Sequence, residues 1–192
     1  MIEINVKQEL TLKIFANKYL FEQWMRQIFY LNDSLNKEYD TIYQNQYYIL
    51  IYNLLTEGKT YTEETIESIN GCKNHYLIKF YDRLYKAILE LKSILKDDEY
   101  NYLEYRRHGS CHIFQDSYEI IQDNGKIKEK RKNVNIFELK QDLQDVIARY
   151  NGDKGFDIYL TKTFYPILCT LYAELTSIHL EEKKNGVVQN FL

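Results

Sequence analysis

The chain has 192 residues and a formal net charge of −3, with 45% hydrophobic and 28% charged residues. These values fit a globular protein that buries a sizeable core, and the acidic balance excludes a protein that binds nucleic acid over its whole surface. One proline and seven glycines are few for this length. Because all-β proteins need many turns, this scarcity favours an all-α fold with long helices.

The sequence also bears on the compartment. The three cysteines, Cys72, Cys111 and Cys169, are widely spaced and form no CxxC pair, which indicates reduced thiols. The first residues include an acidic side chain and no apolar stretch typical of a signal peptide, and no apolar run approaches the length of a membrane span. We therefore expect a cytoplasmic protein with no membrane contact.

The first third of the chain is predicted to be helical. Apolar residues recur at mostly helical intervals over residues 8–35, with a break or bend at Asn32-Asp33-Ser34. A second helix is predicted over residues 37–56, and it stops at Gly58. Thr60 and Glu63 have the spacing of a capping box, in which each side chain satisfies a free backbone amide. They are predicted to open a short helix that ends near Asn70-Gly71.

The strongest helical pattern covers residues 74–95. Its apolar residues form one continuous stripe at intervals of three and four: Leu77, Phe80, Tyr81, Leu84, Ile88, Leu91 and Leu95. The acidic run Asp97-Asp98-Glu99 either ends this helix or is an exposed stretch before the helix resumes through Tyr105.

A β-hairpin is predicted as a small insertion at residues 118–132. Asn124-Gly125 is a two-residue turn signal, because both positions tolerate a positive φ angle. The flanking residues, with Ile120 and Ile127, would form the two strands.

The rest of the chain is predicted to return to helices. Asn135 begins one helix, which Asn151-Gly152 ends. A last helix covers residues 156–184 with a kink at Pro166, and residues 185–192 form a loose tail. We find no repeat and no linker, so the prediction is a single helical domain over residues 1–192, a bundle of about five to seven helices with the hairpin inserted.

The segment from Tyr105 to His112 holds two of the four histidines. On a helix or in a tight turn, Arg107 and His112 can meet on one face. A histidine with a pKa near neutrality can take a proton from an RNA 2′-hydroxyl or give one to the leaving oxygen. An arginine can hold the phosphate by a bidentate contact as charge develops. This chemistry suits RNA cleavage that needs no metal and no cofactor.

Arg107-His108-Gly-Ser-Cys-His112 resembles the motif of the HEPN superfamily, whose nuclease branch has an arginine, four to six variable residues and a histidine, often with a polar residue after the arginine. The resemblance implies a metal-independent endoribonuclease with an active site assembled at a homodimer interface, and a role as a toxin or in phage defence. His112 would be the acid/base and Arg107 the phosphate anchor, with His108 and Arg106 as secondary contributors.

The hairpin departs from the family pattern, because compact members often continue helically after the motif. The same insertion carries the densest basic patch of the chain, Lys126, Lys128, Lys130, Arg131 and Lys132. Alternate lysines on a strand point the same way and would follow an RNA backbone. The other interpretation is a charged, solvated hairpin that blocks edge-to-edge aggregation.

Other interpretations of the segment stay open. It can be an exposed Arg/His turn, a metal site of His108, Cys111 and His112, or a nucleophilic Cys111 beside a histidine. A non-catalytic protein would instead bind a partner, as an immunity protein, an antitoxin or an inhibitor does. The 19 tyrosines are explained by genome composition or by an RNA-stacking surface.

Overall fold

A computed structural model describes residues 6–70, 74–111, 118–123, 126–131 and 141–185. The fold is helical, as the sequence predicts. The helices are α1 (Val6–Lys37), α2 (Thr41–Asn53), α3 (Lys59–Ser68), α4 (His75–Ile94), α5 (Asp97–Cys111), α6 (Gln141–Arg149) and α7 (Asp153–Lys184). Of these helices, none has both the length and the apolar character that a membrane crossing requires.

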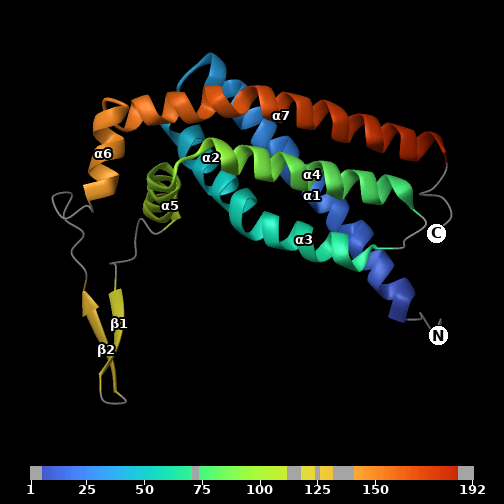
Figure 1. Cartoon of the computed structure of the whole chain (residues 1–192), viewed down its shortest axis with the longest axis horizontal. Coiled ribbons are helices and arrows are strands. Elements are labelled where there is room, and N and C mark those ends of the chain that lie inside the picture. Colours follow the sequence, from blue (N-terminus) through green and yellow to red (C-terminus); the bar gives the residue numbers. More distant parts are fainter. Residues whose placement is uncertain (1–5, 71–73, 112–117, 124–125, 132–140, 186–192) are drawn as a thin grey trace.

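The two longest helices, α1 and α7, run through most of the length of the bundle (Figure 1). α7 packs along both α1 and α4, while α2 packs against α1 and α5. α5 and α6 contact each other at one end of the bundle. The core contains the predicted stripe of α4 and matching residues of α2 and α7, among them Tyr47, Tyr48, Ile51, Phe80, Leu84, Ile88, Phe156, Leu160 and Phe164.

The predicted break at residues 32–34 is wrong, because α1 continues to Lys37. Asn32 is fully buried and accepts a hydrogen bond from the Tyr47 hydroxyl. Asp33 accepts hydrogen bonds from Lys37 Nζ at 2.6 Å and from the Tyr165 hydroxyl at 2.9 Å. The Asn32 amide oxygen is satisfied by α2, and the Asp33 carboxylate by Lys37 of the same helix and by Tyr165 of α7. The helix therefore persists where these residues in isolation would favour a turn.

The ends predicted for the second helix are also corrected. α2 begins at Thr41, where the Asp40 side chain accepts the backbone N–H groups of Ile42 and Tyr43. At the other end, a π-helical turn at Leu54–Gly58 connects α2 directly to α3. Gly58 is buried and helical, and a Cβ atom there would lie 3.4 Å from the Trp24 ring. It therefore lies inside the helical run and does not stop the helix.

The predicted capping box is wrong for the same reason, since the chain is already helical when it reaches Thr60. Glu63 instead accepts hydrogen bonds from Lys59 Nζ at 2.6 Å and from the Tyr85 hydroxyl at 2.7 Å. The carboxylate thus joins α3 to α4.

The helix stops and resumes near the acidic run, but this run neither ends α4 nor forms an exposed stretch before α5, since α5 begins with it and Glu99 is buried. α4 begins at His75, one residue after the predicted start, with Asn74 as its N-cap, and it ends at Ile94. Asp97, Asp98 and Glu99 form the first turn of α5, where negative charge is favourable because it faces the positive end of the helix dipole.

Two strands, β1 (Tyr118–Asp123) and β2 (Lys126–Arg131), pair antiparallel, with Tyr118 opposite Arg131 and Asp123 opposite Lys126. They lie beyond α5 and α6 at the end of the bundle (Figure 1). The turn predicted at Asn124-Gly125 and the N-cap predicted at Asn135 lie outside the described residues.

The C-terminal helices meet at the predicted corner. Asn151 and Gly152 have φ angles of 57° and 104°, and the Gly152 N–H donates to the Ile147 carbonyl at 2.8 Å, which ends α6. α7 then continues as one helix through Pro166 to Lys184. Of the predicted tail, residues 186–192 lie outside the described residues.

Candidate functional site

The candidate segment occupies the last turns of α5, which contains Arg106, Arg107 and His108. His112 lies outside the described residues, and the side chain of His108 is likewise not among those described. The structure therefore places the two arginines of the predicted site, and it leaves the distance between Arg107 and His112 as a prediction.

Arg107 is partly exposed, and its guanidinium carbon lies 5.5 Å from the centre of the Tyr52 ring of α2. The Tyr52 hydroxyl donates to Glu104 Oε1 at 2.8 Å. Burial and this carboxylate raise the pKa of Tyr52 above its ordinary value, while the nearby Arg107 charge opposes the rise. The Tyr52 ring is therefore neutral, and its hydrogen bond to Glu104 orients it beneath the guanidinium, with which it forms a cation–π contact.

Arg106 faces a different environment, because successive positions on a helix point about 100° apart. Its side chain is only 16% exposed. It forms ion pairs with Asp153 Oδ2 at 3.2 Å and Asp157 Oδ2 at 3.7 Å, both on α7. Its guanidinium carbon also lies 4.9 Å from the centre of the Tyr48 ring of α2. Arg106 thus joins α5 to two other helices.

Asp157 is a fully buried carboxyl group at the centre of these contacts. It accepts hydrogen bonds from the Tyr39 hydroxyl at 2.9 Å and from the Tyr48 hydroxyl. Burial raises the pKa of Asp157 to about 7, although the hydrogen bond from Tyr39 acts in the opposite direction. The carboxyl group therefore changes charge close to neutral pH.

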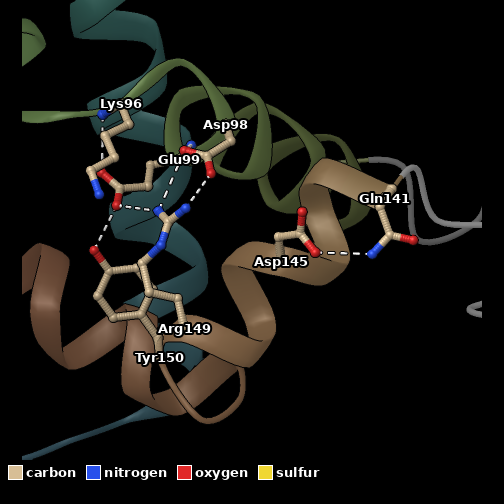
Figure 2. A network of polar contacts seen from close by, with 7 residues as sticks. All are labelled: Lys96, Asp98, Glu99, Gln141, Asp145, Arg149 and Tyr150. Atoms are coloured by element: carbon tan, nitrogen blue, oxygen red, sulfur yellow. Dashed lines mark hydrogen bonds and ion pairs between the residues drawn. The ribbon is translucent and has the colours of Figure 1, made fainter.

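A second polar network attaches α6 to the start of α5 (Figure 2). Arg149 donates to Glu99 Oε1 at 2.8 Å and to Asp98 Oδ2 at 2.5 Å. The buried Glu99 also accepts from the Tyr150 hydroxyl at 2.7 Å and from the Lys96 backbone N–H at 3.0 Å. The hydrogen bonds from Arg149 lower the pKa of Asp98. These contacts fix the end of the bundle from which the hairpin extends.

The predicted basic patch lies mainly on β2, which contains Lys126, Lys128, Lys130 and Arg131, while Lys132 lies outside the described residues. The strand register sets Lys130 opposite Glu119 and Lys126 opposite Asp123.

The predicted alternative of a metal site involves His108, Cys111 and His112, whose side chains the structure does not describe. Across the side chains that it does describe, no group of three His, Cys, Asp or Glu residues is placed to hold a metal ion.

Sequence reasoning missed Tyr52, Asp153 and Asp157 as neighbours of the two arginines. A signal for Asp157 exists, because it precedes the buried Leu160 and Phe164 by three and seven positions on the same helix. A carboxylate on a buried stripe indicates an internal partner. Nothing in the local sequence connects Tyr52 with Arg107, which follows 55 positions later.

Comparisons with protein-family models, with curated proteins and with solved structures found no match to this chain.

Proposed function

We propose that this protein is a metal-independent endoribonuclease of the HEPN type, in which Arg107 binds the scissile phosphate and His112 transfers protons. The observation that supports it most is the placement of Arg107 at the end of α5, where its partly exposed guanidinium lies over the Tyr52 ring. An arginine at such a place can offer a bidentate contact to a phosphate. The neighbouring Arg106 is also partly exposed and pairs with two carboxylates of α7.

The proposed reaction is an internal transesterification of RNA. The 2′-oxygen loses its proton to a histidine and attacks the phosphorus, the bond to the 5′-oxygen breaks, and that oxygen receives a proton. The products are a 2′,3′-cyclic phosphate and a 5′-hydroxyl end. Arg107 would stabilise the charge on the phosphate oxygens by a bidentate contact. Two proton transfers favour two histidines, supplied by His108 or by a second copy of the chain in a homodimer.

The other predicted residues have supporting roles in this proposal. The basic residues Lys126, Lys128, Lys130, Arg131 and Lys132 would guide RNA toward the end of α5 through contacts with its phosphates. Cleavage of cellular RNA would serve as a toxin activity or in antiviral defence.

The test is cleavage of a mixed, end-labelled RNA pool in the presence of EDTA. We expect the parent protein to cleave RNA and to leave 5′-hydroxyl ends. His112→Ala should lower the rate at least about 100-fold, because it removes a proton-transfer group. The control is His75→Ala, which changes an exposed histidine at the start of α4 and should leave the rate unchanged. Equal rates for the parent and His112→Ala would refute the mechanism.

A second candidate function, a non-catalytic protein-binding factor, is favoured by a different surface. A groove of about 520 Å³ lies between α1 and α2 and has no charged side chain in its lining: Gln27, Tyr30, Leu31, Ser34, Tyr43, Gln46, Ile49 and Leu50. Tyr30 is 56% exposed and Tyr43 is 47% exposed. Large exposed aromatic side chains are typical of protein interfaces.

The two functions are separable by one pair of variants. A binding factor shows no EDTA-resistant cleavage, and its complex with a partner protein is lost in Tyr43→Glu, which puts a charge into the neutral groove. In a ribonuclease, cleavage depends on His112 and is unaffected by Tyr43→Glu.

A further inference from the structure

We infer that Arg106 is a positioning residue and not an RNA ligand: by pairing with the buried Asp157, it fixes the last turns of α5 so that Arg107 stays on the Tyr52 ring. This inference rests on the proposed function for its effect on catalysis, but its structural part is independent of it.

α5 is attached to α2 through both arginines. Arg106 and Arg107 are consecutive on α5, and they lie over Tyr48 and Tyr52, which are one helical turn apart on α2. The distances to the ring centres are 4.9 Å and 5.5 Å. Because both arginines lie against the same helix, a shift of α5 that displaces one guanidinium also displaces the other.

Arg106 is held by groups of α7 and of α5 itself. Its ion pairs with Asp153 and Asp157 come from α7, and the Tyr102 hydroxyl, one turn earlier on α5, lies 3.4 Å from its Nη1 atom. The Tyr48 hydroxyl donates to the same Asp157. A side chain that is 16% exposed and surrounded by these groups has little surface left for a phosphate.

Removing Arg106 would destabilise the fold around the buried Asp157. A fully buried carboxyl group needs a compensating charge or a proton. Above about pH 7, where Asp157 is ionised, replacing Arg106 alone leaves the carboxylate with the Tyr39 and Tyr48 hydroxyls but without its cation. Replacing Asp157 by Asn at the same time removes the unpaired charge and keeps the side-chain shape. Such a rescue is expected for a positioning residue and not for an RNA ligand, since Asp157 is buried and cannot touch RNA.

The experiment compares the parent protein with Arg106→Gln, Asp157→Asn and the double variant in the EDTA-resistant RNA cleavage assay. We expect Arg106→Gln to lower kcat on the order of tenfold to a hundredfold with little change in KM, because a small displacement of Arg107 weakens its contact with the phosphate. The double variant should recover most of the loss. An equal loss in the single and double variants would show that Arg106 acts on RNA directly and would overturn the inference.

A second readout separates this inference from the ribonuclease proposal. The NMR signal of the Arg107 Nε–H group is sensitive to the Tyr52 ring beneath the guanidinium. Arg106→Gln should move this signal, and the double variant should restore it, whether or not the protein cleaves RNA. The control is Arg83→Gln, which breaks an arginine ion pair with Glu174 between α4 and α7 and should leave the signal in place. A signal that Arg106→Gln does not move contradicts the positioning role, and absent cleavage in the parent contradicts only the enzyme.

Discussion

Asp157 combines full burial with three polar neighbours, namely two tyrosine hydroxyls and the Arg106 guanidinium. Burial disfavours the charged form and raises the pKa of its carboxyl group to about 7, from an ordinary value of 3.8. The Asp157 carboxyl group thus titrates near neutral pH, and its contribution to the free energy of unfolding depends on pH.

One prediction follows from the linkage between proton binding at Asp157 and folding. Between pH 4 and pH 7 the folded protein binds the Asp157 proton more strongly than the unfolded chain does. The contribution of Asp157 to the free energy of unfolding is therefore present at low pH and is lost as the pH rises through 7. Relative to Asp157→Asn, the parent should lose about 2 to 3 kcal/mol of stability between pH 5 and pH 8.

Urea unfolding of both proteins at a series of pH values measures this difference. A difference that stays constant from pH 5 to pH 8, or that grows in favour of the parent, would show that the Asp157 carboxyl group does not bind its proton more strongly in the folded state.

At the scale of elements, the corner between α6 and α7 depends on one glycine. Gly155 lies in the first turn of α7, and a Cβ atom there would lie 1.7 Å from the Tyr150 carbonyl oxygen. No flexible side chain is involved, so the backbone itself would have to move. Only a residue without a Cβ atom permits this close approach.

Gly155→Ala should consequently destabilise the protein by about 2 kcal/mol or more, because backbone overlap has to be relieved by separating α6 from α7. The matched control is Gly58→Ala, whose Cβ atom would have its nearest contacts at 3.4 Å and lies in a helical backbone. It should change the free energy of unfolding by less than about 1 kcal/mol. Thermal or urea unfolding of the two variants checks the prediction, and similar losses in both would contradict it.

The two strands supply a second prediction at the scale of elements, which belongs to the proposed function. Changing Lys126, Lys128 and Lys130 of β2 to Gln should weaken RNA binding and reduce its salt dependence, since fewer phosphate contacts release fewer ions. Binding titrations at several salt concentrations measure both effects. An unchanged salt dependence would mean that these lysines serve only as a solvated surface.

Tyrosine side chains connect the helices more than the sequence suggests. Several tyrosine hydroxyls donate to carboxylates on other helices, as in the pairs Tyr52–Glu104, Tyr85–Glu63, Tyr102–Asp153, Tyr150–Glu99 and Tyr165–Asp33. Each pair satisfies a carboxylate where the helices pack. Partners this far apart in the chain cannot be found from local patterns.

The elements themselves were predictable where one face is continuously apolar, as in α4, and at the Asn151-Gly152 corner, where a positive φ angle is needed. The prediction failed at residues 32–34 and at Gly58. Local turn propensity is overridden at both places by tertiary contacts, the Tyr47 hydrogen bond to Asn32 and the close packing of Trp24 against Gly58.

For the whole molecule, the long helices α1, α4 and α7 form the bundle, and α5 with α6 and the two strands lies at one end (Figure 1). The candidate site belongs to that end. The sequence predicted Arg107 as the phosphate anchor and Arg106 as a secondary contributor, but it could not show which groups surround each of them. Their difference comes from α7 and α2, which approach α5 only in the folded chain.

The most direct test of this account is the single-turnover rate of RNA cleavage in EDTA for Arg107→Ala, compared with the parent and with Arg26→Ala, a change of an exposed arginine on α1. We predict a loss of about 100-fold or more for Arg107→Ala, because the phosphate loses its guanidinium, and an unchanged rate for Arg26→Ala. A rate for Arg107→Ala equal to that of the parent would contradict the proposed site.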